Sequence, residues 1–173
     1  CSSGIPSFGG PVAIRSDDGV VTTGPELTTG RIGVLQLTEA GLLDSTFGSG
    51  GIACINPGPL AFPHDLLLQS DDRVVIPGGY AISGATDIFV ARLTVTGTLD
   101  TSFGGTGIVT TRVGPVADDH TFSYGVIQDD AKIILATQIE DDFALMRYSS
   151  IGLPDETFGP NGIITASIGS NYN

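Results

Sequence analysis

Two histidine–aspartate pairs are the residues of this chain whose types could support acid–base or metal chemistry: His64-Asp65 and Asp119-His120. A general base needs a carboxylate within hydrogen-bond reach to orient it. Both pairs fall at or just before an expected strand, where adjacent side chains point to opposite faces. We therefore expect loop or surface histidines, with no catalytic or metal-binding role.

Paired carboxylates recur along the chain and suggest calcium as the alternative ligand. The pairs are Asp17-Asp18, Asp71-Asp72, Asp118-Asp119, Asp129-Asp130 and Asp141-Asp142. Calcium takes about six to eight oxygens from a converging loop, and no pair lies in a D-x-D-x-D-G frame followed by Glu. The sequence also has no nucleophile elbow and no phosphate-binding loop. We expect hairpin turns, no cofactor and no enzyme, with a weak calcium site as the alternative.

Composition excludes several classes of partner. The 173 residues carry 7 Lys+Arg against 19 Asp+Glu, a net charge of −12, so a nucleic-acid partner is not expected. With 40% apolar residues the chain can build a core. No apolar stretch approaches the roughly 20 residues that span a bilayer. An acidic chain with one lysine is typical of exported proteins, so we expect an extracellular or cell-surface location.

The two cysteines, Cys1 and Cys54, leave three interpretations open. They can form a disulfide outside the cytosol, or they can be incidental thiols. The start Cys1-Ser2-Ser3-Gly4 resembles the mature start of bacterial lipoproteins, which implies a lipid anchor on Cys1.

An internal repeat organises the whole chain. Phe47, Phe103 and Phe158, each within a Leu/Pro-Asp-x-x-Phe-Gly element, are 56 and 55 residues apart. Two further markers recur with them. An acidic pair recurs in Ser16–Gly19, Ser70–Arg73 and Gln128–Ala131, and a strand-like segment is centred on Gln36, Arg92 and Arg147. Three markers with one period predict three copies of one module.

Each module is expected to form four short antiparallel strands. In the third, apolar or alternating runs cover 122–128, 132–138, 143–149 and 162–168, with turn residues between them. No segment keeps a helical period. The chain is therefore predicted to be all-β, with about twelve strands. The expected boundaries are an N-terminal arm 1–10, repeats 11–55, 56–112 and 113–169, and a tail 170–173.

The Phe-Gly element has a structural interpretation. Asp44, Asp100 and Asp155 are placed to accept backbone N–H groups two or three residues on, closing an Asx turn. The phenylalanines are expected to anchor neighbouring modules. The glycine after each (Gly48, Gly104 and Gly159) is expected to take the positive φ that reverses the chain.

These markers resemble the delta-60 repeat family. The matching segments are Asp71-Asp72-Arg73, Ala91-Arg92-Leu93 and the run 97–104, and the resemblance extends over about residues 10–168. It implies four-stranded blades of a β-propeller and carries no catalytic residues. The chain departs from the pattern at Gln36, where the other modules have Arg, and at Pro154, where they have Leu.

Three modules are too few for a closed propeller, which has about four to eight blades. Two sheet faces would stay open. We expect the chain to associate with itself in a ring or a filament. The alternatives are a fragment of a longer protein and a threefold β-trefoil or prism-like closure.

The preferred function is a non-enzymatic extracellular repeat protein with a structural, assembly or adhesion role. The alternative is a carbohydrate- or protein-binding propeller module whose partners are surface glycans or surface proteins. Tyr80, expected in a loop after Gly78-Gly79, is the best candidate for ligand stacking.

Overall fold

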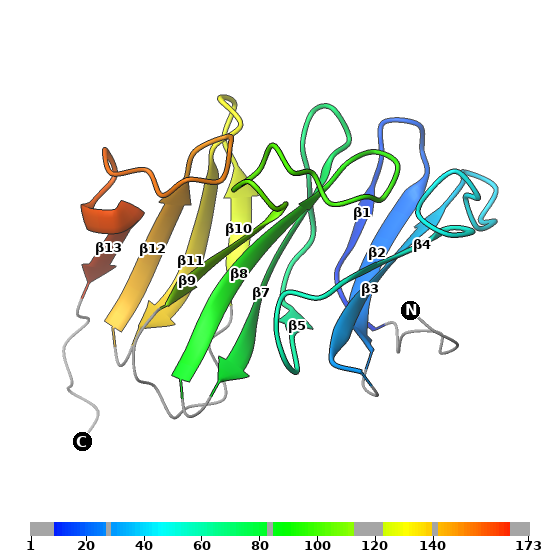
Figure 1. Cartoon of the computed structure of the whole chain (residues 1–173). Helices are drawn as coiled ribbons and strands as arrows, with labels where there is room; N and C mark the ends of the chain where they lie inside the picture. The colour runs from blue at the N-terminus through cyan, green and yellow to red at the C-terminus, as the bar shows by residue number, and fades with distance from the viewer. Residues whose placement is uncertain (1–8, 27–28, 83–84, 113–122, 140–141, 167–173) are drawn as a thin grey trace, which may run out of the picture.

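Three antiparallel sheets lie side by side along the chain (Figure 1). The computed structural model describes residues 9–26, 29–82, 85–112, 123–139 and 142–166. The first sheet contains β1 (Val12–Ile14), β2 (Val20–Glu26), β3 (Arg31–Leu37) and β4 (Ile52–Ile55). The second contains β5 (Phe62–Pro63), β6 (Leu67–Leu68), β7 (Val74–Ile82), β8 (Ala85–Leu93) and β9 (Ile108–Arg112). The third contains β10 (Tyr124–Ile127), β11 (Ile133–Ile139), β12 (Asp142–Tyr148) and β13 (Ile163–Ala166).

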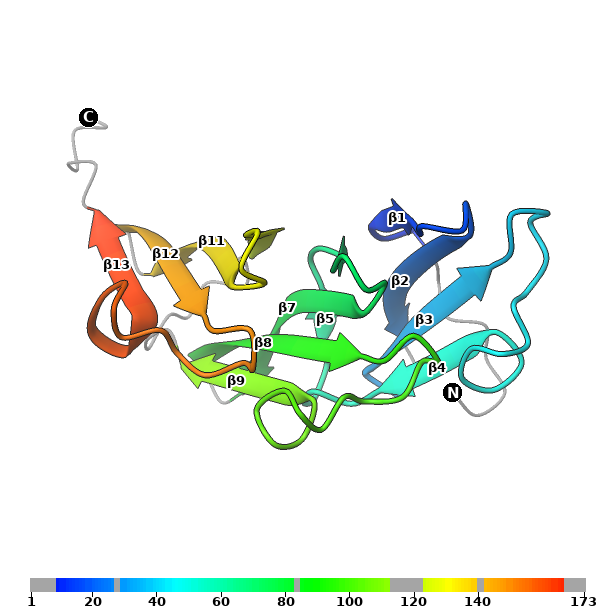
Figure 2. The ribbon, with the colours of Figure 1, turned by 90° about the horizontal axis from the view of Figure 1, so that it is seen from above.

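The all-β, propeller-like prediction is confirmed. In each sheet the strands follow one another in chain order, as in a propeller blade. One 3₁₀ turn, η1 (Pro160–Gly162), is the single helical element among the described residues. Viewed from above, the first and last sheets lie at opposite ends of the row (Figure 2). The chain therefore does not adopt the alternative trefoil or prism-like closure.

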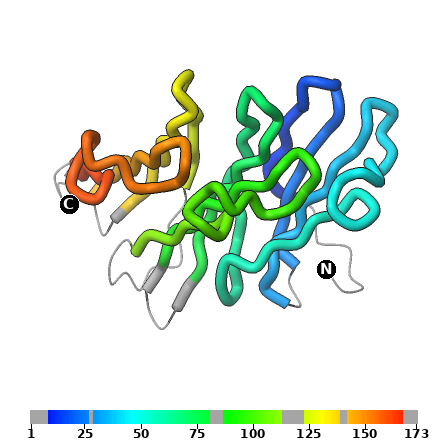
Figure 3. Tube along the Cα trace, turned by 45° about the horizontal axis from the view of Figure 1, so that its top comes forward, coloured from blue at the N-terminus to red at the C-terminus, as the bar shows by residue number. Residues whose placement is uncertain are grey.

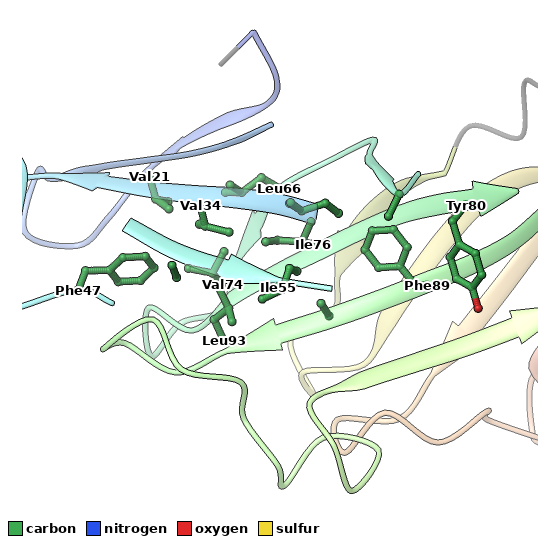
Figure 4. Packing of buried hydrophobic residues seen from close by; sticks show 14 residues of the cluster. Val21, Val34, Phe47, Ile55, Leu66, Val74, Ile76, Tyr80, Phe89 and Leu93 are labelled. Atoms are coloured by element: carbon green, nitrogen blue, oxygen red, sulfur yellow. The ribbon is translucent and has the colours of Figure 1, made fainter. Parts of the chain in front are cut away.

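The middle sheet is buried on both faces, which explains its nearly continuous apolar strands. Along β7, Val74 and Ile76 pack toward the first sheet, and Val75 packs toward the third. Figure 4 shows the first of these two clusters, in which Phe47 and Ile55 of the first sheet lie near residues of β7 and β8. Alternation along a strand thus divides one apolar run between two cores.

A bulge divides the innermost strand of the middle sheet into β5 and β6, so the structure has one strand more than expected. The backbone N–H groups of His64 and Asp65 both donate to the carbonyl of Pro77, at 2.9 and 3.3 Å. Two residues therefore face one, which is the definition of a β-bulge. The bulge aims two consecutive side chains at the neighbouring sheet.

The hairpin turns also correct one alignment made from the sequence. Asp18 and Asp72, each the second residue of an acidic pair, take a positive φ, but in the third sheet Ala131 does so. Gln128 therefore matches Gln69, and Lys132 matches Arg73, one residue later than the acidic pairs suggest.

Candidate functional site: the contacts between sheets

The loop that follows the third strand of each sheet carries the same carboxylate-centred turn. These loops share one edge of the row of sheets (Figure 3). Asp44, Asp100 and Asp155 each accept the backbone N–H two residues on, at 3.0, 3.1 and 3.1 Å. The same oxygen accepts the hydroxyl of Thr46, Ser102 or Thr157.

The cluster of the middle sheet is centred on Arg92, whose guanidinium bridges two sheets. Its Nε donates to Asp100 at 2.9 Å and its Nη2 donates to Ser102 at 3.0 Å. Its Nη1 donates to the backbone carbonyl of Ser150 in the third sheet at 2.6 Å. The guanidinium also lies over the ring of Phe103, 4.6 Å from its centroid. Arg92 is 3% exposed, so it is a buried cation whose Nε, Nη1 and Nη2 all donate hydrogen bonds.

In the first sheet an arginine and a glutamine are also linked to the carboxylate by hydrogen bonds, but the two residue types have exchanged positions. Gln36 stands where the other sheets have Arg, and it donates to Asp44 at 2.6 Å. Arg15, from the end of β1, donates to Gln36 at 3.2 Å. The position of Arg15 is held by Gln69 in the second sheet, where Gln69 accepts from Arg92 at 3.5 Å. The departure at Gln36 is therefore compensated within its own sheet.

A second cation supports the carboxylate in two of the three clusters. Arg73 lies 3.4 Å from Asp100, and Lys132 lies 3.3 Å from Asp155. Hydrogen bonds from Thr157, first through its hydroxyl, lower the pKa of Asp155 to about 2, with Lys132 and Arg147 adding to the effect. Burial raises the pKa of Asp100, but the bonds from Ser102 and the two arginines outweigh it. Both carboxylates are therefore acceptors held in the charged form.

A phenylalanine and a glycine make the same contact at both sheet boundaries. A Cβ added at Gly97 would lie 3.0 Å from the ring of Phe47, and one added at Gly152 would lie 2.9 Å from the ring of Phe103. Next to each contact one backbone hydrogen bond crosses the boundary: Gly48 N–H to Thr96 O, and Gly104 N–H to Ile151 O, both at 2.8 Å. Each loop therefore packs its phenylalanine ring against a glycine turn of the following sheet. This contact, with the backbone hydrogen bond beside it, is called here the lock.

Gly159 does not follow the prediction of a positive φ. Gly48 and Gly104 have φ values of 55° and 59°, but Gly159 is extended, with φ 174°. Pro160 follows it, and a residue before proline is restricted to extended conformations. Asn161 takes a positive φ of 54° instead, and Gly162 keeps the positive φ of its counterparts Gly51 and Gly107.

Gly97→Ala should lower the free energy of unfolding more than Gly105→Ala. Both glycines are left-handed, with φ values of 79° and 81°, so each alanine costs about 1 kcal/mol in backbone strain. Gly105 has no atom within 4 Å of an added Cβ, whereas Gly97 has the Gly48 nitrogen at 2.8 Å. Overpacking should add about 1–3 kcal/mol at Gly97, measured by urea denaturation. Equal effects would contradict the lock.

His64 and Asp65 make a second contact, to the innermost strand of the third sheet. The Ser123 N–H donates to Nδ1 of His64 at 3.1 Å, and the Gly125 N–H donates to Asp65 Oδ2 at 2.9 Å. Ser123 and Gly125 are two residues apart along the open edge that leads into β10, and these bonds satisfy the outward N–H group of each. His64 lies outside the strands, in the segment between β5 and β6, as a loop histidine would, but it is half-buried and holds a contact between sheets. The sequence carries no sign of the bulge that turns both side chains the same way.

Acid should weaken this second contact. Burial lowers the pKa of His64 from 6.5 to about 4, so the folded chain resists protonation. The contribution is complete above pH 6.5 and is lost as the pH falls toward 4, a change of at most about 3 kcal/mol. The melting temperature should fall across this window, and it should fall less in His64→Asn, whose amide oxygen can still accept a hydrogen bond. Parallel curves for the two proteins would contradict this role.

A cavity of about 270 Å³ lies between the second and third sheets, beside the Arg92 cluster. Its lining includes Asp71, Arg73, Arg92, Ser102 and Ser150. Polar hydrogen-bonding groups of both charges therefore face one hollow.

The other residues predicted from the sequence are placed as follows. Tyr80 lies in β7 and not in a loop, and it is 8% exposed, with its ring 6.5 Å from that of Phe89 (Figure 4). Such a ring is part of the core and offers little surface for stacking. Cys54 lies in β4, while Cys1 and His120 lie outside the described residues, so the disulfide and lipid interpretations stay predictions.

Two observations concern membranes and metals. No helix in the described part of the chain has the length and apolar character needed to cross a bilayer. Within the same residues, no group of three or more His, Cys, Asp or Glu side chains is arranged to hold a metal ion.

Comparison with known proteins finds a partial family match and a solved structure of low similarity. The profile of a family described as a domain of unknown function (DUF5122) beta-propeller matches residues 69–103, the segment from the Gln69 hairpin to Phe103. No curated protein matches the chain. Among solved structures, a selenomethionine-substituted virginiamycin B lyase from Staphylococcus aureus is similar at 15% identity, with a TM-score of 0.33, over 93% of this chain and 56% of that one. The chain thus spans about half the length of that protein. The matched segment is thus similar to a β-propeller repeat, and the three sheets have the strand order of propeller blades.

Proposed function

We propose that this chain is a non-enzymatic structural module of the delta-60 repeat type, which completes its blade row by associating with itself. The proposal rests on the exposure of apolar residues on the outward faces of the two end sheets. Positions that are fully buried in the middle sheet lie half-exposed at the ends, although the same kinds of apolar residue occupy them.

The outward surface of the first sheet is called here the head face and is defined by Val20, Leu35, Leu37 and Gly41. Each is intermediate or exposed. Their counterparts in the middle sheet (Val74, Ala91, Leu93 and Gly97) are buried against the first sheet. The apolar side chains of the head face are therefore more exposed than their counterparts because no sheet that the structure describes packs against them.

The outward surface of the third sheet is called the tail face and is defined by Ile134, Phe143, Leu145 and Phe158. Phe143 is 45% exposed, whereas Ile88 at the matched position is 0% exposed. Leu145 and Ile134 are intermediate, whereas Val90 and Val75 are 0% exposed. Burying both faces would remove a large apolar area from water, which favours association.

The remaining features fit a structural role outside the cell. The polar side chains that could do chemistry already hold the loops: Asp100 accepts from Arg92, Ser102 and the backbone. The acidic, lysine-poor composition supports an extracellular or cell-surface location with an assembly or adhesion role.

Sedimentation velocity over a concentration series tests the proposal. We expect particles with at least twice the 17.7 kDa mass of the chain, with dissociation on dilution. Phe143→Ser should shift the equilibrium toward monomer, and Leu60→Ser, at a residue 64% exposed in the link from β4 to β5 and outside both end faces, serves as the surface control. A monomer at every concentration would refute self-association.

The cavity beside Arg92 favours a second candidate, a carbohydrate- or protein-binding module. Carboxylate, guanidinium and hydroxyl groups around one hollow can recognise the hydroxyls of a sugar. Glycan-array binding that is lost in Arg73→Ala would support this function. Unchanged binding in that variant, or no binding, would set it aside.

A further inference from the structure

We propose that copies of this chain associate head-to-tail, with Phe158 of one copy seated against Gly41 of a second copy. This pairing rests on the proposed self-association and specifies its geometry. It assigns the open tail face to the open head face through the same lock that joins the sheets within one chain.

The lock has two halves, and each end of the chain keeps one of them. Within the chain, Phe47 meets Gly97 and Phe103 meets Gly152. Among the described residues, Phe158 contacts no following glycine turn and Gly41 contacts no preceding phenylalanine. Gly41 has a φ of 74°, close to 79° and 82° at Gly97 and Gly152. An added Cβ at Gly41 would meet nothing within 4 Å, so the receiving space is open.

The backbone hydrogen bond of the lock also has its donor at one end of the chain and its acceptor at the other. At the internal boundaries the glycine N–H donates to Thr96 O or Ile151 O. The corresponding groups at the ends are the Gly159 N–H and the carbonyl of Ala40, which have no backbone partner among the described residues. A head-to-tail contact pairs this donor with this acceptor.

Charge favours the same pairing. Arg92 donates through Nη1 to the carbonyl of Ser150, and the corresponding pair across the new boundary is Arg147 and Glu39 of the second copy. Glu39 is exposed and adds a carboxylate beside that carbonyl. In a chain of net charge −12, a boundary that places a cation opposite an acidic residue reduces the repulsion between copies.

The two faces differ, so the interface is heterologous. Such an interface closes into a ring when its rotation allows and otherwise extends as a filament. Two copies provide six sheets, within the range of about four to eight blades of closed propellers. We therefore expect a two-copy ring with two identical boundaries.

Sedimentation velocity on variants of the full chain tests the pairing. Gly41→Ala should raise the dissociation constant about tenfold or more, because a methyl group then meets the Phe158 ring of the second copy. Gly105→Ala, with the same left-handed strain and open surroundings, should leave association unchanged. Phe158→Ala should weaken association by a similar factor, provided that its melting curve shows a folded chain.

Mixing the two weakened variants distinguishes the arrangements. Head-to-tail pairing predicts that a Gly41→Ala chain and a Phe158→Ala chain form mixed dimers more tightly than either forms its own, because one intact boundary is regenerated. No such recovery, or weakening by only one of the two changes, would overturn the pairing while self-association stands. A monomeric parent chain would overturn both proposals.

Discussion

Arg92→Ala is expected to lower the free energy of unfolding by about 3–5 kcal/mol, as when one partner of a buried ion pair is removed. Arg92 is 3% exposed, and its loss leaves Asp100 facing Arg73 alone at 3.4 Å. The bond to Ser150 O and the contact with the Phe103 ring are lost in the same step, so the boundary between sheets weakens with the loop. Urea denaturation monitored by circular dichroism measures the change.

Arg147→Ala is the matched control, because Arg147 makes the same bond to Asp155 at 2.9 Å in the last sheet. Its side chain is 18% exposed, against 4% for Arg92, and no sheet follows it among the described residues. At concentrations where the chain is monomeric, its loss should cost about 1 kcal/mol. Similar losses in the two variants would contradict a bridging role for Arg92.

The first sheet suggests a rescue of the middle cluster. Arg15 and Gln36 occupy the positions of Gln69 and Arg92, with the charge at the other site. Arg92→Gln combined with Gln69→Arg should therefore be at least about 1 kcal/mol more stable than Arg92→Gln alone, as residues in contact couple by about that amount. Strict additivity would show that the two positions do not substitute for each other.

The sequence predicts the sheets well because the signal for them is local. The runs expected at 132–138 and 143–149 become β11 (Ile133–Ile139) and β12 (Asp142–Tyr148). Alternation, β-branched residues and turn residues are properties of a few neighbouring positions. Repetition strengthens the assignment, because the same pattern recurs with one period.

The boundary contacts depend on positions that no local pattern reveals. The β-bulge at His64 is defined by two backbone N–H groups that donate to the same carbonyl, that of Pro77. Pro77 lies on the neighbouring strand, β7, so the segment around His64 does not reveal the bulge by itself. The exchange of Arg15 and Gln36 joins residues 21 positions apart. Tyr80 follows two glycines and resembles a loop residue, but β8 continues beside it and pairs Tyr80 with Asp87. In all three cases, contacts with segments distant in the sequence determine the local structure.

The departure at Pro154 needs no compensation, although the repeat pattern alone could not show this. The bridge that closes this loop is made by the Asp155 N–H, which donates to Arg147 O at 2.9 Å. Asp100 donates to Arg92 in the same way, so the residue before each aspartate supplies no N–H to the bridge. A proline, which has none, is therefore accommodated.

Phe103→Ala is expected to lower the free energy of unfolding by about 3–5 kcal/mol, as for other fully buried aromatic residues. The ring is 0% exposed and lies between the Arg92 guanidinium and Gly152, in the cluster formed by the second and third sheets. Its loss leaves a cavity at the boundary that holds the third sheet in the row. Thermal and urea unfolding measure the change.

Phe158→Ala tests whether the boundary, and not the loop, needs the phenylalanine. The guanidinium of Arg147 lies over this ring at 4.5 Å, as Arg92 lies over Phe103, so the loop contacts are matched. The ring is half-buried, and no sheet follows it among the described residues. At concentrations where the chain is monomeric, its replacement should cost about 1 kcal/mol, less than half the loss at Phe103. If both replacements cost the same, the phenylalanine stabilises its own loop, and the lock between sheets is not the source of its effect.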